Sequence, residues 1–258
     1  MKATFYKYQA TGNDFVVIDN RDHHFPKKKA SLISDLCHRR FGIGADGLIL
    51  IEKDPEADFR MTYFNADGRE GSMCGNGGRC AVAFAAFLGI IGESCTFMAV
   101  DGTHRARLEG DRVSLQMADV HEIRTKPHYS FLNTGSPHHV QEVEGLDGFD
   151  VPNEGKRLRY GIYGQAGSNI NFVAVLGPDS LRVRTYERGV EDETYSCGTG
   201  VTASALALYE GGKLTEPAVR VATRGGDLQV RFEQAAPGRY TDIWLTGPAE
   251  MVYKGEWL

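Results

Sequence analysis

Two short segments of the chain each place a cysteine before a glycine-rich turn and a stretch with helical character. They are residues 73–77 (MCGNG) and 196–200 (SCGTG). A cysteine at a helix N-terminus lies beside backbone N–H groups and the positive end of the helix dipole, which favour thiolate over thiol. Two such turns can hold a carboxylate-bearing carbon between two sulfurs. One sulfur removes the α-proton as thiolate, and the other donates a proton on the opposite face.

The other cysteines, Cys37, Cys80 and Cys95, are expected to be buried packing residues, the common role of a free cysteine. Cys80 follows Cys74 by six residues and therefore lies well inside the helix that Cys74 begins. The five cysteines contain no C-x-x-C pair, so they predict neither a zinc site nor a disulfide framework.

The surroundings of Cys74 and Cys197 also match, which indicates a diverged internal repeat. An alternating strand and a turn precede each cysteine, at 61–68 and 181–189. An alanine-rich helix that ends at glycine follows each one, within 81–89 and 201–212. Neither helix has a charged face, so we expect both to be buried on all sides.

The separation of matching positions is nearly constant along the two halves. It is 122 residues from Phe64 to Tyr186, 123 from Cys74 to Cys197 and 124 from Gly102 to Gly226. The opening strand, 12–17, has an apparent relative at 169–174, which would make residues 30–53 an added helix and strand of the first half. The later strands correspond as well: 95–100, 105–108 and 113–117 with 218–222, 228–232 and 241–245.

The repeat predicts an α+β fold of two pseudo-symmetric domains, each a mostly antiparallel β-sheet or barrel wrapped around a central apolar helix. We expect the active site in the cleft between them. The predicted N-terminal domain is 1–118, which the C-terminal strand 248–258 can complete, and the C-terminal domain is 119–247. Residues 118–130 interrupt the strand pattern and mark the boundary.

Composition excludes several classes of function. The 258 residues are 41% apolar, which is sufficient for two packed cores. A net charge of −5 gives no reason to expect binding of nucleic acid or an anionic membrane. No segment has the pattern of a signal peptide or the length of a membrane span, so we expect a cytoplasmic protein with free thiols.

At these residues the chain resembles the diaminopimelate epimerases, a family of cofactor-independent two-thiol epimerases. The resemblance implies reversible conversion of LL-2,6-diaminopimelate to the meso form, for lysine and peptidoglycan synthesis. It also implies an isomerase that needs no cofactor or metal and forms a homodimer. The matching segments, in family order, are TGNDF (11–15), FGIGADG (41–47), FNADG (64–68), MCGNGGRC (73–80), GSPH (135–138), NINF (169–172), YERG (186–189) and CGTG (197–200).

The resemblance also implies roles for individual residues. Cys74 and Cys197 are the acid–base pair. Four backbone amides would hold the carboxylate at the reacting centre: Gly75, Asn76, Gly198 and Thr199. Four side chains would contact the substrate and check its distal end: Asn13, Asn65, Asn169 and Arg188. Glu187 would lie beside the reacting amine.

Two positions depart from the family pattern. Ser136 stands where asparagine is frequent, and Gly47 stands where some members have glutamine, so both contribute less to the expected substrate contacts. His138 is expected to support the site, and His139 to be an ordinary strand residue.

Other functions would require other features in the sequence. Proline racemases and 4-hydroxyproline epimerases share the two-cysteine chemistry, but the polar set around Glu187 and Arg188 exceeds what a cyclic imino acid needs. The segment 42–47 fits the dinucleotide pattern G-x-G-x-x-G, yet a helix precedes it and a strand follows, the reverse of the required context. No lysine lies in a setting typical of a pyridoxal phosphate enzyme. A non-enzymatic binding fold is a further alternative, although it does not account for both cysteines.

Overall fold

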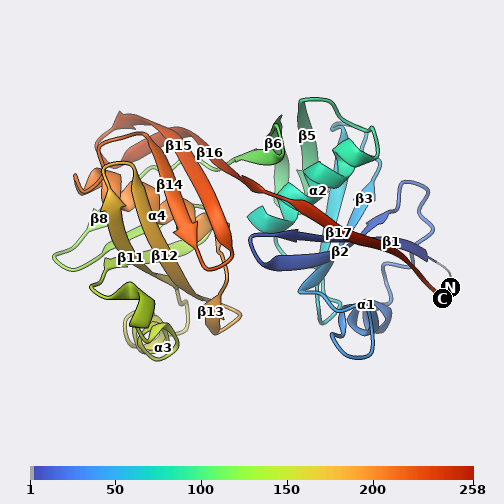
Figure 1. Cartoon of the computed structure of the whole chain (residues 1–258), viewed down its shortest axis with the longest axis horizontal. Coiled ribbons are helices and arrows are strands. Elements are labelled where there is room, and N and C mark those ends of the chain that lie inside the picture. Colours follow the sequence, from blue (N-terminus) through green and yellow to red (C-terminus); the bar gives the residue numbers. More distant parts are fainter. Residues whose placement is uncertain (1–2) are drawn as a thin grey trace. The chain divides into compact units, whose positions relative to one another are not determined.

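The computed structural model describes residues 3–258 and shows two compact units. The first unit runs to Leu115 and also takes in Gly247–Leu258, and the second is Gln116–Thr246. The chain therefore leaves the first unit once and returns to it at its C-terminal end. Figure 1 shows this return as the red strand β17 beside the blue strand β1.

The first unit is a curved, mostly antiparallel sheet with two helices. Its strands pair in the order β17–β1–β2–β3–β4–β5–β6–β7, with β2–β3 and β4–β5 parallel and the other pairs antiparallel. The elements are β1 (Ala3–Ala10), β2 (Asn13–Asp19), α1 (Ala30–Cys37), β3 (Gly47–Glu52), β4 (Phe59–Asn65), α2 (Gly75–Phe87), β5 (Ser94–Ala99), β6 (Gly102–Glu109), β7 (Arg112–Gln116) and β17 (Glu250–Trp257).

The second unit repeats this arrangement. Its strands pair in the order β8–β9–β10–β11–β12–β14–β15–β16, with β10–β11 and β12–β14 parallel, and the short β13 pairs with β12. The elements are β8 (Ile123–Thr125), β9 (Ser130–Asn133), β10 (Pro137–Glu142), η1 (Leu146–Gly148), α3 (Val151–Gly161), β11 (Asn169–Gly177), β12 (Ser180–Glu187), β13 (Asp192–Thr194), α4 (Gly198–Glu210), β14 (Ala218–Thr223), β15 (Gly226–Ala236) and β16 (Arg239–Pro248).

The two orders superimpose strand for strand, and the parallel pairs fall at the same places. The predicted α+β class, the mostly antiparallel sheets and the pseudo-symmetry of the two halves are confirmed. Helix α2 follows β4, and α4 follows β12 after the short β13. Likewise α1 follows β2, and α3 follows β10 after the 3-10 turn η1.

One predicted match is wrong. Strand β2 runs parallel to β3, the place that β10 holds beside β11, so residues 12–17 correspond to 135–140 and not to 169–174. Residues 30–53 are therefore not an addition, because α1 and β3 have counterparts in α3 and β11. The two candidate strands have similar apolar patterns, and only strand pairing distinguishes them.

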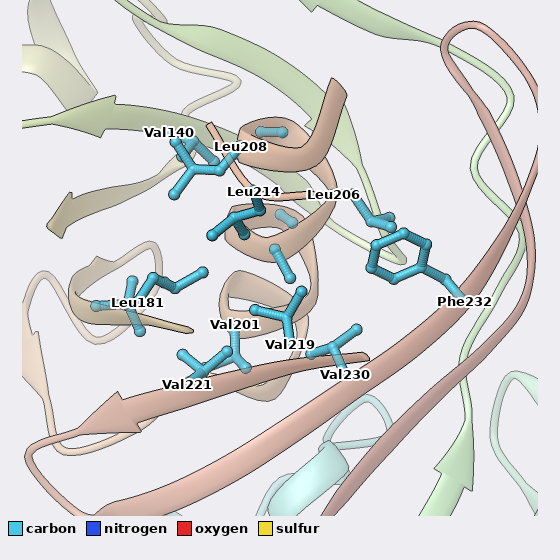
Figure 2. Packing of buried hydrophobic residues seen from close by; sticks show 14 of the residues in the cluster. Val140, Leu181, Val201, Leu206, Leu208, Leu214, Val219, Val221, Val230 and Phe232 are labelled. Atoms are coloured by element: carbon cyan, nitrogen blue, oxygen red, sulfur yellow. The ribbon is translucent and has the colours of Figure 1, made fainter. Parts of the chain in front are cut away.

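The central helix of each unit is the core around which the sheet packs, as predicted. Every side chain of α4 from Val201 to Leu208 is buried, and the helix contacts β8–β12, β14 and β15. Figure 2 shows Leu206 of α4 among residues from the surrounding strands, such as Val219 and Phe232. Burying one such side chain stabilises the fold by roughly 1.5–3 kcal/mol. Helix α2 contacts β1–β4 and β17 in the same manner.

Helix α3 packs against the end of β12, the strand that leads to Glu187 and Arg188. The close contact is at Gly155, where an added Cβ atom would lie 2.3 Å from Cβ of Tyr186. The Tyr186 side chain is 2% exposed and joins a small apolar cluster with Val151, Leu158 and Phe172. A glycine is therefore required where the helix approaches the strand.

We expect Gly155→Ala to lower the free energy of unfolding by about 1–3 kcal/mol, because the new methyl group must displace Tyr186. Alanine's better helix propensity recovers at most about 1 kcal/mol of this loss. The matched control is Gly161→Ala in the same helix, where no atom lies within 4 Å of the added Cβ. Urea unfolding of both variants checks the prediction, and equal stability of the two would contradict it.

Candidate active site

Each of the two motif cysteines is the residue at which a central helix begins. Cys74 is the N-cap of α2 with φ −109° and ψ 127°, and Cys197 is the N-cap of α4 with φ −119° and ψ 110°. In both turns the cysteine carbonyl accepts the first helical hydrogen bond, from Gly78 at 2.7 Å and from Val201 at 2.8 Å. The N–H groups of the preceding residues of each first turn have no acceptor within the helix. Each turn is thus suited to hold an anion beside a sulfur.

In the first unit, an asparagine carbonyl faces the sulfur. The Cys74 thiol donates to Oδ1 of Asn13 at 3.6 Å, and Nδ2 of Asn76 donates to the same oxygen at 3.4 Å. Asn13 begins β2, directly after a two-residue hairpin turn in which Thr11 has φ 47° and Gly12 has φ 85°. The hairpin therefore delivers Asn13 to the first turn of α2.

An ion-pair network that runs from the buried Lys7 to the exposed Arg39 and Asp46 fixes the orientation of the Asn13 amide. Asn13 Nδ2 donates to Oδ2 of Asp46 at 2.5 Å, so Oδ1 must point toward Cys74. Arg39 bridges Asp46 and Asp14 at 2.7 Å each, and Lys7 pairs with Asp14 at 2.6 Å. Burial raises the pKa of Asp14, but hydrogen bonds from Arg39 and Lys7 outweigh this effect and hold it below its usual value. The Asp14 carboxylate therefore stays ionised.

Arg79, inside the motif that Cys74 opens, is fully buried. Its Nη2 donates to Oγ1 of Thr11 at 3.1 Å and to Oδ1 of Asn76 at 2.9 Å, and its Nε donates to the carbonyl of Pro248 at 3.3 Å. Burial lowers the pKa of Arg79 to about 10, which still leaves it a cation at neutral pH. The guanidinium ties the hairpin turn and the end of β16 to the first turn of α2.

In the second unit, a hydroxyl group takes the corresponding place. Thr199 Oγ1 lies 3.5 Å from the Cys197 sulfur and 3.5 Å from Oγ of Ser136. The Thr134 hydroxyl donates to the backbone carbonyl of Thr199 at 2.9 Å and ties the β9–β10 turn to α4. Ser136 also accepts from Nδ2 of Asn169 at 2.9 Å.

The hydrogen bonds of a buried histidine define its tautomer. Asn171 Nδ2 donates to the carbonyl of His139 at 2.8 Å, so the same amide nitrogen must donate to Nδ1 of His138, at 3.2 Å. Oδ1 of Asn171 accepts from Thr185 at 2.9 Å, which agrees with this orientation. His138 therefore carries its proton on Nε2 and donates it to Ser136 at 3.0 Å. Burial lowers the pKa of His138 to about 3, with Arg188 adding to the effect, so the ring is neutral.

The remaining residues expected to contact substrate lie at strand ends. Asn169 begins β11, and its Oδ1 accepts from the backbone N–H of Arg188 at 2.9 Å. The Arg188 guanidinium donates to the carbonyl of Ala166 at 3.0 Å, and Glu187 is the last residue of β12. Asn65 ends β4, where its side chain lies beside Gly71. Of these four residues, Asn169 is joined to the second helix start, because its Nδ2 donates to Ser136.

Gly47 is buried beneath the side chain of Tyr63. A Cβ atom added at Gly47 would lie 2.5 Å from the carbonyl oxygen of Phe64 and 2.5 Å from the Tyr63 ring. The space that a larger residue would need at this position is therefore filled by tyrosine. Glycine at position 47 and tyrosine at position 63 therefore pack against each other as a pair.

The other cysteines are buried, as predicted. Burial raises the pKa of Cys37 and of Cys95 to about 12, and it raises the pKa of the fully buried Cys80 further. All three are therefore protonated at neutral pH. Among residues 3–258, no group of three or more histidine, cysteine or carboxylate side chains is arranged to hold a metal. No helix within that range is both long and apolar enough to cross a membrane.

His139 lies within β10, as expected of a strand residue, and three other residues were missed. His139 is fully buried, stacks on Tyr129 at 4.3 Å and bonds to Tyr163 at 2.9 Å, so it anchors β10. The missed residues are Arg79, Asp46 and Asn171. Arg79 carries a sequence signal, because it is a charged residue at the start of an apolar helix, and Asp46 lies in a matching family segment. Asn171 had no signal apart from its place in the segment NINF.

Several solved structures share the fold of this chain. The phenazine biosynthesis protein (PhzF family) of Bacillus anthracis aligns over 100% of this chain and 99% of its own, with a TM-score of 0.78 and 13% identity. A probable proline racemase from Agrobacterium radiobacter aligns over 99% of this chain and 93% of its own, with a TM-score of 0.71 and 15% identity. Similarity at these identities shows the shared two-unit α+β fold alone.

Sequence comparison then gives the family. The diaminopimelate epimerase family model matches residues 5–121 and 130–252. The diaminopimelate epimerase of Flavobacterium psychrophilum is 56% identical over 251 residues, 96% of this chain and 98% of that protein. The diaminopimelate epimerase of Chlorobaculum tepidum is 45% identical over 95% of this chain and 97% of its own. The chain belongs to the diaminopimelate epimerase family.

The neutral histidines of β10 make stability depend on pH. Burial lowers the pKa of His139 to about 4 and of His138 to about 3, whereas both titrate near 6.5 in an unfolded chain. The unfolded state therefore binds more protons below about pH 6.5, so this stability is present above that pH and is lost as the pH falls toward 4. Each histidine contributes a slope of up to about 1.4 kcal/mol per pH unit.

We expect His139→Gln to make this pH dependence shallower by about the slope of one histidine, because glutamine does not titrate. Urea unfolding of the wild type and the variant at pH 7, 6 and 5 measures both slopes. A variant that loses stability on acidification as steeply as the wild type would contradict the buried, neutral state of His139.

Proposed function

We propose that the protein is a cofactor-independent isomerase that interconverts LL-2,6-diaminopimelate and meso-diaminopimelate. The observation that carries the proposal is the cysteine that begins the buried helix of each unit, at the same place in the repeat. Membership of the diaminopimelate epimerase family supports the substrate. The fold similarity to a probable proline racemase is distant, at 15% identity, and favours no second substrate.

In this proposal, Cys74 and Cys197 act on opposite faces of one α-carbon. A thiolate removes the α-proton, and its sulfur becomes a thiol. The electron pair left on carbon is delocalised into the neighbouring carboxylate, and the second thiol then donates its proton to the other face. The configuration at carbon inverts, and the two sulfurs exchange protonation states. No electron leaves the substrate, so the step requires no oxidant or reductant.

The backbone N–H groups at the two helix starts, at Gly75, Asn76, Gly198 and Thr199, stabilise the charge that develops on the carboxylate. Helix N-termini favour anions through their N–H groups and the helix dipole. Preorganised donors of this kind are commonly a large part of rate acceleration. The proposal assigns the distal amino-acid end of the substrate to Asn13, Asn65, Asn169 and Arg188, and it places Glu187 beside the reacting amine.

The organisation expected from the sequence is part of the same proposal. The functional domains are 1–118, completed by strand 248–258, and 119–247, with substrate bound in the cleft between them. A homodimer in the cytoplasm, with no nucleic-acid or membrane partner, is proposed on the family resemblance and on the net charge of −5.

We expect Cys74→Ala and Cys197→Ala each to reduce epimerisation at least about 100-fold, because each removes one acid–base group. The assay follows formation of meso-diaminopimelate from the LL isomer by chiral chromatography, with purified protein and no added cofactor. Cys95→Ala is the matched control and keeps wild-type activity, because Cys95 is a buried thiol in β5. Normal turnover by either active-site variant, or turnover of L-proline in place of diaminopimelate, would contradict the proposal.

A further inference from the structure

The pseudo-symmetry of the fold places equivalent residues around the two sulfurs. Strand β2 aligns with β10 through their parallel partners, because Phe15 pairs with Gly47 as His138 pairs with Asn169. The equivalent positions are 123 residues apart throughout the site, and they are Thr11 and Thr134, Asn13 and Ser136, Cys74 and Cys197, and Asn76 and Thr199. Differences within these pairs are therefore differences between two copies of one scaffold.

At the first sulfur, the scaffold presents a hydrogen-bond acceptor. The Asn13 amide nitrogen is held by Asp46, so only its carbonyl oxygen faces Cys74, at 3.6 Å. A protonated thiol can donate to this oxygen, whereas a thiolate there would face the negative end of the amide dipole. This contact favours the thiol form of Cys74.

At the second sulfur, the scaffold presents a donor. Ser136 accepts from Nε2 of His138 and from Nδ2 of Asn169, so its own proton is directed to Thr199 Oγ1. Thr199 in turn has its hydroxyl proton available for the Cys197 sulfur at 3.5 Å. A hydroxyl that donates to sulfur favours the thiolate.

The direction of this relay is fixed at its far end. Asn171 is oriented by the carbonyl of His139 and the hydroxyl of Thr185, and it leaves His138 with Nε2–H as its only donor. Gly200, in the first turn of α4, makes room for the Asn171 amide, since an added Cβ atom would lie 2.3 Å from Oδ1. The chain of donors from Asn171 to Cys197 therefore runs in one direction.

We propose that the free protein holds Cys197 as the thiolate, through the donor relay of Ser136 and Thr199, and Cys74 as the protonated thiol, through the acceptor Asn13. The inference rests on the proposed function in one respect, namely that both sulfurs belong to the reaction. It names Cys197 as the base in the resting state and Cys74 as the acid. Ser136, Asn171 and His138 are positioning residues, because they act on the sulfur through Thr199.

The charged groups near the two turns are compatible with this assignment. Near Cys74, the carboxylates of Asp14 and Asp46 are balanced by Lys7 and Arg39. The buried cation Arg79 donates to Thr11, Asn76 and Pro248. Its positive charge stabilises the Cys74 thiolate that forms when Cys74 has donated its proton to the substrate. Near Cys197, His138 is neutral and Arg188 carries the positive charge. Arg79 thus assists the reverse direction, which a reversible epimerase also needs.

The test is the pH dependence of alkylation by iodoacetamide, with each thiol measured where the other is absent. Cys74→Ser reports Cys197 and Cys197→Ser reports Cys74, so that each variant keeps one of the two motif thiols and its titration is read alone. Peptide mass spectrometry identifies the modified cysteine. Because a hydrogen bond to a charged group shifts an ionisation by about one to two pH units, we expect the alkylation midpoint of Cys197 to lie at least about one unit below that of Cys74.

Three variants in the Cys74→Ser background test the relay itself. Thr199→Val should raise the Cys197 midpoint by about one pH unit, and Thr199→Ser should restore it. Thr202→Val is the matched control on the same helix, and it should leave the midpoint unchanged, because the Thr202 hydroxyl donates to the carbonyl of Gly198.

A midpoint for Cys74 at or below that of Cys197 would overturn the proposal. Equal midpoints for Thr199→Val and Thr202→Val would overturn the role of the relay. Alkylation needs no substrate, so its result is separate from that of the epimerisation assay. Failure to turn over diaminopimelate would leave these midpoints as they are, and would refute the proposed function alone.

Discussion

The site depends on one local constraint, the start of a helix inside the core. Helices α2 and α4 are buried by the sheets around them, yet the N–H groups of a first turn always lack acceptors within their own helix. An apolar core cannot satisfy these donors. The first turn must therefore face polar groups or a ligand, and the residue that begins the helix lies at that boundary. In both units this residue is cysteine.

The surrounding structure follows from this constraint. The β1–β2 hairpin brings Asn13 to one helix start, and the β9–β10 turn brings Ser136 to the other. A charged or neutral network behind each turn fixes the orientation of the group that meets the sulfur. In the first unit it is the cluster of Asp46, Asp14 and Arg39, and in the second it is the hydrogen-bonded pair of Asn171 and His138. The two halves share their backbone geometry, and they differ in the polar group that faces each sulfur.

The sequence predicted the repeat, the α+β class and the two helix starts, because glycine turns, alanine-rich helices and alternating strands have strong local signals. It misassigned the strand at 12–17, because buried strands of similar composition are not distinguishable without their pairing. The better signal was the likeness of Thr11-Gly12-Asn13 to Thr134-Gly135-Ser136, at the same separation as the cysteines. The tautomer of His138 and the burial of Arg79 were beyond sequence reasoning, since both depend on contacts between residues distant in the chain.

The central claim is that two sulfurs, and not one, transfer the proton. It is tested most directly by deuterium incorporation when the wild-type protein converts LL-diaminopimelate in D₂O, with product and remaining substrate analysed by mass spectrometry at low conversion. A two-base reaction places solvent deuterium at the α-carbon of the product, while the recovered LL substrate stays unlabelled. Deuterium entering the LL substrate as fast as it enters the meso product would show a single exchanging base and contradict the account.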